Sequence, residues 1–541
     1  MKAVRYKARI AFGLFVTINT KSLTARPVNR IDSFIGNFRG ACDRRGILNW
    51  GGMAFFSEPA ATNAVHADGL LRAPPSAVGV DGARIAAFLE DATRAGLELH
   101  GLMLHRDGKV VIDAAWWPYR TDTPRVMHSV AKSVTACAVG LAIEEGLFAL
   151  SDKVVSFFPE HLPRAVDDKL AMMTVEDLLT MRTGHAQETS GSSWRAIDGS
   201  WIGEFFKIPI VHAPGTVFVY TSAASYMLAA ILFRVSGQTL HAYLRPRLFE
   251  PLGIEGESWD IGSDGINPGG NGLNFKPVDL LKFCALHAQG GVWNGRRLLP
   301  AQWVADATRR RGDDEYGYHW VTRANGTYCA LGLFVQMGLV FPEQGASVVI
   351  VGAIDGSDKI NPLIDRHFPD ALAGGGGAAG DQRLVETLKR LTVPRQLNSV
   401  RANTPAIVSG VAYAMDPNAL GVTAVQADFR DRRCVLSLTD GDGVHQITAG
   451  FDDWVEGVSS MPGFDLHHGY RLPSARVLAA AEQLNETTTR LTWIFPDTAF
   501  RDTVTCRFEG DRLTFERGVN VNSGALAWPT LTGRATRRPG Q

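Results

Sequence analysis

The stretch that most constrains the fold is an apolar segment from Thr123 to Leu150. Apolar residues occur on every side of it, and Ala and Gly fill most of the other positions. A helix without a polar face belongs inside a large domain, because none of its sides is suited to water. The segment therefore predicts a buried helix and a domain whose core is large enough to surround it.

Two polar residues stand at the start of this helix, Ser129 and Lys132. Residues three apart share one face of a helix, and an unpaired buried lysine is costly, so a core helix gains no stability from it. Burial lowers the pKa of a lysine, and a neutral lysine one turn away can accept the proton of a serine hydroxyl. The pair predicts a nucleophilic serine with a lysine as its base.

A structural interpretation fits the same two residues. Ser129 is a good helix cap, and the ammonium group of Lys132 can extend to solvent. The S-x-x-K spacing is also short enough for a chain of 541 residues to match it by chance. On these residues alone the two interpretations are about even.

Composition excludes several classes of function. The chain is 45% apolar and 20% charged, as in ordinary globular proteins. Basic and acidic residues both number 55, which gives no indication of nucleic acid or an anionic membrane as partner. The six cysteines are far apart and there is no H-E-x-x-H, so we expect no disulfide framework, no metal and no cofactor.

The N-terminus has a basic start and a short apolar run from Ile10 to Ile18, which resembles a weak signal peptide. No stretch approaches the roughly 18 consecutive apolar residues of a membrane span. We therefore expect a cytoplasmic protein without a membrane span, with export as the alternative.

Changes in pattern predict four segments. Residues 1–72 form an extension without clear periodicity, and residues 73–372 mix helical and strand patterns. A Gly-rich linker and a helix are expected over 373–403, and strand patterns alone over 404–541. The last segment therefore predicts a separate all-β domain, a barrel or a sandwich.

Within residues 73–372 the pattern predicts an α+β domain. Two strands, Leu99–His105 and Lys109–Trp116, flank an Asp-Gly turn and precede a mostly helical stretch. Strand patterns return from Tyr316 onwards. An antiparallel sheet built from both ends of the segment, with a helical lobe between them, fits this order.

Several motifs of this domain resemble those of the β-lactamase-related serine hydrolases, the class C β-lactamase, esterase and D-aminopeptidase group with the penicillin-binding-protein fold. Besides S-V-A-K they are TVEDLLTMRTG (174–184), PGTVFVY (214–220), LFEPLGI (248–254) and GGVWNGRRLL (290–299). The resemblance implies Ser129 as nucleophile, Lys132 as its partner and Tyr220 as the tyrosine of a Y-x-S motif that ends at Ser222. A phenol beside a lysine ammonium is expected to have a lowered pKa and to shuttle protons.

The family's third motif, [K/H/W]-x-G on a strand beside the site, has no good counterpart. Arg182–Gly184 precedes Tyr220 in a loop, and His467–Gly469 lies in the β domain. The best register is Leu333-Phe334-Val335, which has no cation and has Val where Gly is usual. The expected substrate-binding residues are Ser222, Leu333, Phe334 and Gln336, with backbone N–H groups of Ser129 and about Gln336 binding the oxyanion.

The expected function is a serine hydrolase of esterase or amidase type, or an acyl transferase, that forms an acyl-enzyme on Ser129 with Lys132 and Tyr220 as proton-transfer partners. Its substrate would be a small ester or amide without a carboxylate beside the scissile bond. Two alternatives stay open. One is a catalytically silent relative that binds a ligand, for which Val335 argues. The other is a cell-wall peptidase or penicillin-binding protein, which needs export and a carboxylate anchor. Nothing in the sequence predicts the oligomeric state.

Overall fold

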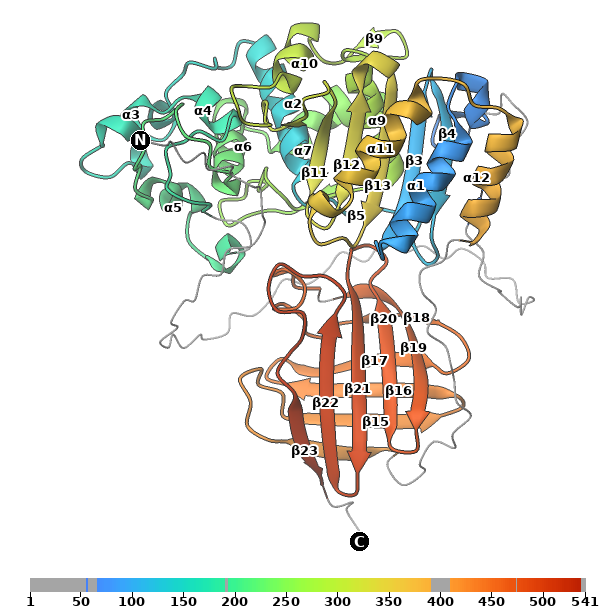
Figure 1. Cartoon of the computed structure of the whole chain (residues 1–541). Coiled ribbons are helices and arrows are strands. Elements are labelled where there is room, and N and C mark those ends of the chain that lie inside the picture. The colour runs from blue at the N-terminus through green and yellow to red at the C-terminus, as the bar shows by residue number, and fades with distance from the viewer. Residues whose placement is uncertain (1–54, 57–65, 190–192, 391–408, 473, 537–541) are drawn as a thin grey trace, which may run out of the picture. The chain divides into compact units, whose positions relative to one another are not determined.

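A computed structural model describes residues 55–56, 66–189, 193–390, 409–472 and 474–536 (Figure 1). The signal-like start, most of the predicted extension and the end of the predicted linker lie outside these residues. We call residues 66–390 the mixed domain and residues 409–536 the barrel. Where the boundaries between independently folding parts lie stays a prediction.

The mixed domain is built around one sheet (Figure 1). Strands β3 (Leu99–Arg106) and β4 (Lys109–Ala115) form the predicted hairpin, and Asp107 and Gly108 turn it with φ values of 50° and 75°. The sheet continues from β3 to three strands from the other end of the domain, β13 (Ala346–Gly352), β12 (Gln336–Phe341) and β11 (Tyr328–Gly332). The predicted assembly of the sheet from two distant segments is confirmed. Short strands complete its edges: β1 (Phe55–Phe56), β2 (Leu71–Arg72) and β10 (Val321–Thr322).

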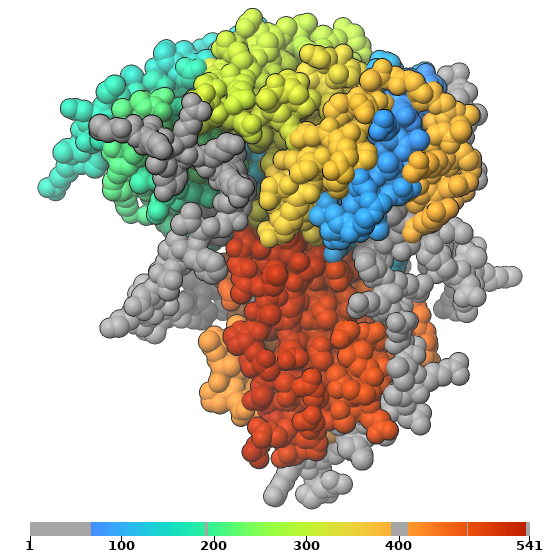
Figure 2. Space-filling model, viewed as in Figure 1, coloured from blue at the N-terminus to red at the C-terminus, as the bar shows by residue number. Residues whose placement is uncertain are grey.

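Three helices cover one face of this sheet. Helix α1 (Gly82–Arg94) begins after Asp81, whose carboxylate accepts the N–H of Ala83. It lies between α11 (Asn361–Leu372) and α12 (Ala378–Arg390), side by side on the surface in Figure 2. Helix α12 is the helix expected in the linker, and its buried leucines belong to the same core as α1.

The helical lobe and two further helices lie on the other side of the sheet. Helix α2 (Val130–Glu144) is buried along most of its length, beside α6 (Ser222–Ser236), and α9 (Pro277–Ala288) packs on the sheet. At Gly140 a Cβ would lie 2.4 Å from the Trp303 ring, so a side chain has no room there. The other helices are α3 (Asp168–Met172), α4 (Val175–Leu179), α5 (Trp201–Lys207), α7 (Leu240–Leu244), α8 (Glu250–Leu252) and α10 (Ala301–Thr308).

A small sheet lies next to the start of α2. Its strands are β5 (Arg125–Val126), β7 (Leu273–Phe275) and β6 (Ser258–Trp259). A separate two-stranded ribbon is formed by β8 (Val292–Trp293) and β9 (Arg296–Arg297). Because β5 ends only three residues before Ser129, this small sheet holds the chain that leads to the predicted nucleophile.

The prediction of strands from Tyr316 onwards is only partly correct. Residues 316–320 are not a strand, and β10 is limited to two residues. The next stretch divides into β11 and β12 because Phe334 and Val335 take left-handed conformations, with φ of 59° and 63°. Such values are costly for bulky and β-branched residues, so the turn they form is held by its surroundings.

The C-terminal segment is a closed barrel of nine strands, which resolves the expected choice between barrel and sandwich. The strand order is β17-β16-β15-β14-β23-β22-β21-β20-β19, and β19 pairs back onto β17. Alternate residues of β21 and β22 point into its apolar core. The bounds are β14 (Val411–Met415), β15 (Ala424–Arg430), β16 (Arg433–Asp440), β17 (Gly443–Gly450), β18 (Val455–Ser459), β19 (Ala475–Asn485), β20 (Thr488–Ile494), β21 (Arg501–Glu509), β22 (Arg512–Val519) and β23 (Leu531–Ala535).

No helix in the described ranges is both long and apolar enough to cross a membrane. The five cysteines in the same ranges are buried free thiols, and Cys42 lies outside them.

Candidate active site

Ser129 occupies the cap position of α2, but its side chain makes no capping hydrogen bond. Lys132 does not extend to solvent, since only 1% of it is exposed. Both parts of the structural interpretation of S-x-x-K therefore fail. The two side chains instead meet, with Lys132 Nζ 3.2 Å from Ser129 Oγ.

The Lys132 amine has two further partners. It donates to Ser222 Oγ at 2.9 Å and to the carbonyl of Gly270 at 2.9 Å. A Cβ on Gly270 would lie 3.1 Å from Nζ, so the glycine lets the backbone approach the amine closely. An ammonium has three N–H groups and a neutral amine has two and a lone pair. With Ser222 and Gly270 taking two N–H groups, the neutral amine has its lone pair available for the hydroxyl of Ser129.

Burial lowers the pKa of Lys132 to about 7, against a smaller opposing effect of the Glu188 carboxylate. The charged amine loses its hydration inside the domain, and the Glu188 carboxylate compensates for only part of this loss. A substantial fraction of the amine is therefore neutral near pH 7. Lys132 meets both requirements of a general base, contact with the proton to be moved and a pKa near neutrality.

Tyr220 completes the group. Its ring lies with its centroid 4.8 Å from Lys132 Nζ, and its hydroxyl is hydrogen-bonded to Ser129. The lowered phenol pKa expected from the sequence is wrong: burial raises it, and the bond to Ser129 opposes this only in part. Tyr220 therefore keeps its proton at neutral pH and can act as a donor.

The other predicted substrate-binding residues have different surroundings. Ser222 contacts Lys132, as described. The amide of Gln336 is fully buried and donates to Leu333 O, Phe334 O and Gly352 O, so it holds the β11–β12 turn. Phe334 is 2% exposed and packs on Phe500 of the barrel, while Leu333 is half-buried against the barrel core. These side chains hold the structure together, and they do not form an open pocket wall.

The oxyanion donor expected near Gln336 is also misplaced. Gln336 pairs on one side with Gly332 and on the other with Val351, so it lies inside the sheet. The strand that faces α2 is β11. Strand β10 pairs only with the first two residues of β11, so the rest of that edge of β11 has no strand partner in β10. At Gly332 a Cβ would lie 2.2 Å from Met127 O, which brings this strand directly against the segment before Ser129.

We predict that Phe334→Ala destabilises the folded protein by about 3–5 kcal/mol, the usual loss when a buried phenylalanine is truncated. The reason is its contact with His128, at 5.5 Å between ring centroids, and with Phe500. Urea unfolding followed by tryptophan fluorescence measures this. Leu333→Ala, at the half-buried neighbour, is the matched control with a smaller loss. Equal unfolding midpoints for Phe334→Ala and the wild type would contradict the placement of this ring.

The sequence did not reveal that a barrel loop contributes to this region. The Tyr470 hydroxyl lies 3.3 Å from His128 Nδ1, next to the nucleophile, and the His468 ring lies 6.0 Å from the His128 ring. The neighbouring His467 turns away and bonds Asp502 at 2.8 Å. The sequence signal for this loop is the triplet His467–Gly469, although its position in the β domain argues against a place in the site. In the described ranges no group of three or more His, Cys, Asp or Glu is placed to hold a metal ion.

The fold of the mixed domain agrees with the comparisons to known proteins. The family model described as Beta-lactamase matches residues 83–366, more than half of the chain, so the protein belongs to the β-lactamase family. The resemblance inferred from the motifs is thereby confirmed.

Individual relatives are more distant. The chain is 29% identical to Esterase EstB of Burkholderia gladioli over 208 residues, which cover 33% of this chain and 53% of the esterase. It is 28% identical to Lovastatin esterase of Penicillium rubens over 159 residues, covering 25% and 40% respectively. The chain thus spans about half the length of the curated relatives it matches. A solved penicillin-binding protein homologue from Caulobacter crescentus is similar with a TM-score of 0.43, at 19% identity, over 52% of this chain and 96% of that one.

Proposed function

We propose that this protein is a serine hydrolase that cleaves carboxylic esters through an acyl-enzyme on Ser129. The observation that carries the proposal is the contact of Ser129 Oγ with a buried Lys132 amine, 3.2 Å away, whose pKa is about 7. The esterases among its relatives support the same reaction class. Acyl transfer to an alcohol in place of water uses the same intermediate.

In the first half of the proposed reaction, the neutral amine of Lys132 takes the hydroxyl proton of Ser129. Oγ forms a bond to the ester carbonyl carbon, and the carbonyl electron pair moves onto its oxygen. When the pair returns, the bond to the alcohol oxygen breaks. The leaving alkoxide receives the proton of the Lys132 ammonium through the protonated hydroxyl of Tyr220.

In the second half, water attacks the acyl-enzyme and gives its proton to the same amine. The acid is released, and Oγ regains its proton. The oxyanion formed in each half would be bound by the backbone N–H of Ser129 at the start of α2. A second N–H from the outer edge of β11, within Ala330–Gly332, replaces the donor expected near Gln336.

Two rival functions have less support. A silent binding protein has no need for a lysine with a depressed pKa against a serine, and Val335, which argued for that class, is buried in the core between sheet and helices. A cell-wall peptidase needs a cation beside the scissile bond. The triplet Leu333-Phe334-Val335 supplies none.

The test is a comparison of two chromogenic substrates. We expect p-nitrophenyl butyrate to be hydrolysed with at least about tenfold higher kcat/KM than nitrocefin, because an unpaired carboxylate next to the scissile bond loses its hydration without a partner. Stopped-flow absorbance measures both. If nitrocefin is the better substrate, the protein is a β-lactamase or peptidase by function. If neither is turned over and no acyl-enzyme appears by intact mass, the silent class is correct.

A further inference from the structure

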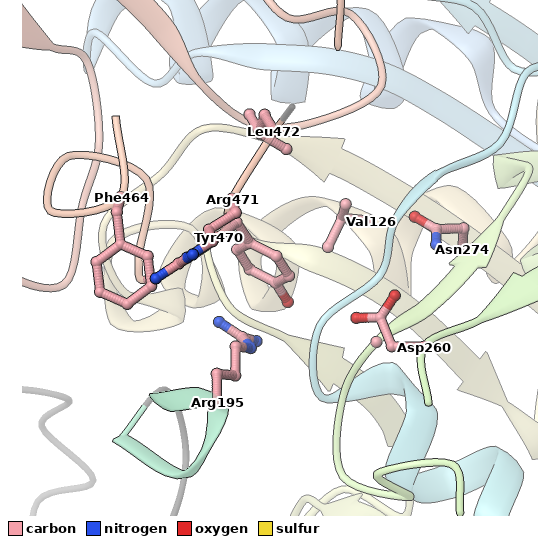
Figure 3. A pocket seen from close by; sticks show the side chains of 10 residues that line it. Val126, Arg195, Asp260, Asn274, Phe464, Tyr470, Arg471 and Leu472 are labelled. Carbon is pink, nitrogen blue, oxygen red and sulfur yellow. The ribbon is translucent and has the colours of Figure 1, made fainter. Parts of the chain in front are cut away.

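A pocket of about 350 Å³ opens where the mixed domain meets the loop between β18 and β19 (Figure 3). Among the residues that line it are Val126, Arg195, Asp260, Asn274, Tyr470 and Arg471. Nothing in the proposed reaction uses Arg195, Asp260 or Arg471. Three ionisable side chains gathered in one hollow require an explanation.

The pocket lies next to the candidate active site. Val126 is three residues before Ser129, so their Cα atoms are at most about 11 Å apart. Its backbone is held by the barrel, since Val126 N–H donates to Asp497 O at 2.9 Å. On the barrel side, Tyr470 contacts His128 through its hydroxyl, 3.3 Å from Nδ1. A substrate of moderate length bound at Ser129 therefore reaches this space.

The charges of the pocket are arranged for a ligand. The guanidinium of Arg195 lies 3.7 Å from the centroid of the Tyr470 ring, and its Nη1 donates to His468 O at 2.8 Å. These contacts orient the guanidinium, but they do not neutralise it. Among the described residues no carboxylate lies within ion-pair distance of Arg195 or Arg471. At longer range the Arg195 guanidinium acts on Asp260: burial raises the pKa of this carboxyl, and the guanidinium opposes that effect only in part. In Figure 3 the side chains of Arg195, Tyr470 and Asp260 face a common space.

We propose that this pocket is a substrate subsite that binds a carboxylate carried at the far end of the ester, away from the scissile bond. Arg195 and Arg471 would bind the carboxylate, and Tyr470 would form the wall between it and the reacting group. Two arginines and one aspartate leave a single positive charge, which suits a monoanion better than a phosphate dianion. The proposal rests on the proposed ester hydrolysis. In it, the cations that bind a substrate carboxylate come from the helical lobe (Arg195) and the barrel (Arg471), and not from the β11–β12 turn.

The test uses pairs of esters that differ only in a terminal carboxylate. One pair carries it on the acyl side, p-nitrophenyl hydrogen adipate against p-nitrophenyl hexanoate. The other carries it on the alcohol side, 4-(butanoyloxy)benzoate against the corresponding benzamide. In at least one pair we expect the wild type to prefer the anion. In Arg195→Gln the ratio of the two kcat/KM values should fall about tenfold or more, the usual effect of losing a hydrogen bond to a charged group.

Two further variants give the sign of the effect. Asp260→Asn should raise the preference for the anion, because it removes a negative charge from the same pocket. Arg296→Gln, at an exposed arginine of β9 far from the pocket in sequence, should leave the ratio unchanged. Arg471→Gln serves as the second pocket variant if Arg195→Gln does not fold. An arginine that only joins the helical lobe to the barrel would lower the melting temperature without changing either ratio, and that result would overturn the proposal.

A binding measurement separates this proposal from the proposed function. Calorimetric titration of hexanoate into Ser129→Ala protein needs no catalysis. About tenfold weaker binding to the Ser129→Ala, Arg195→Gln double variant supports the subsite even if no ester is hydrolysed. A different outcome is possible: neutral esters are hydrolysed, but replacing Arg195 or Arg471 changes neither hexanoate binding nor either kcat/KM ratio. That outcome leaves the proposed function intact and rejects the subsite.

Discussion

A fluorophosphonate probe is expected to label the wild-type protein on one serine and to leave Ser129→Ala unlabelled. The hydroxyl of Ser129 is the one in contact with the buried amine of Lys132, and a serine without an adjacent base is a weak nucleophile. Intact mass spectrometry followed by peptide mapping measures the loss, which should reach the detection limit.

Ser133 provides the matched control, because it is a buried serine one turn further along α2. Its hydroxyl donates to His319 O at 2.7 Å and does not contact Lys132. Ser133→Ala should therefore still be labelled. Undiminished labelling of Ser129→Ala, or loss of labelling in the control alone, would show that the nucleophile lies elsewhere.

Lys132→Met is expected to slow both labelling and ester hydrolysis by about a hundredfold or more, the usual contribution of a general base. Methionine fills a similar volume without a proton acceptor. Lys132→Arg separates the base from the charge, since a guanidinium stays protonated. We expect it to be equally slow. A fast arginine variant would mean that the positive charge and not proton transfer is what matters.

The pH dependence follows from the pKa of about 7 for Lys132. The neutral amine is the active form, so the rate of acylation should rise from pH 5.5 to pH 8 with its midpoint near pH 7. A single-turnover assay at each pH reports acylation directly. A rate that is constant over this range would indicate that the amine is neutral throughout or is not the base.

Local signals predicted much of the mixed domain. The Asp-Gly turn between the two predicted strands depends on a few neighbouring residues, and it is present at Asp107 and Gly108. In the structure the acid cap of α1 and the capping box between Thr174 and Asp177 of α4 are equally local. Strand β19 contains Ala479–Ala481 and Glu482, which are poor strand formers, so its extended conformation depends on pairing with β18 and β20 and not on local preference. The turn at Phe334 was missed because its left-handed backbone is imposed by tertiary contacts.

The site divides in the same way. Ser129 and Lys132 share a helix face, so their spacing alone brought them together, and the Y-x-S motif added Tyr220 and Ser222. Their contacts agree with that prediction, while their catalytic roles remain to be tested. The pocket residues come from three parts of the chain, at Arg195, Asp260 and Tyr470, and no spacing rule connects these. In the sequence Arg195 and Asp260 look like ordinary charged surface residues. Only the tertiary structure, in which the barrel loop lies beside β5, brings them together with Tyr470.

The order of strands in the central sheet has a consequence for synthesis of the protein. Strand β3 leaves the ribosome early, but its partner β13 follows some 240 residues later, as the pair Arg106 and Ala346 shows. At about 5–20 residues per second this delay lasts roughly 12–48 s. For most of that time the apolar helix α2 has been made, but the strands β11 and β12 on which it packs have not. Such a nascent chain is a natural client for chaperones, and a chain truncated before β13 is expected to aggregate when expressed.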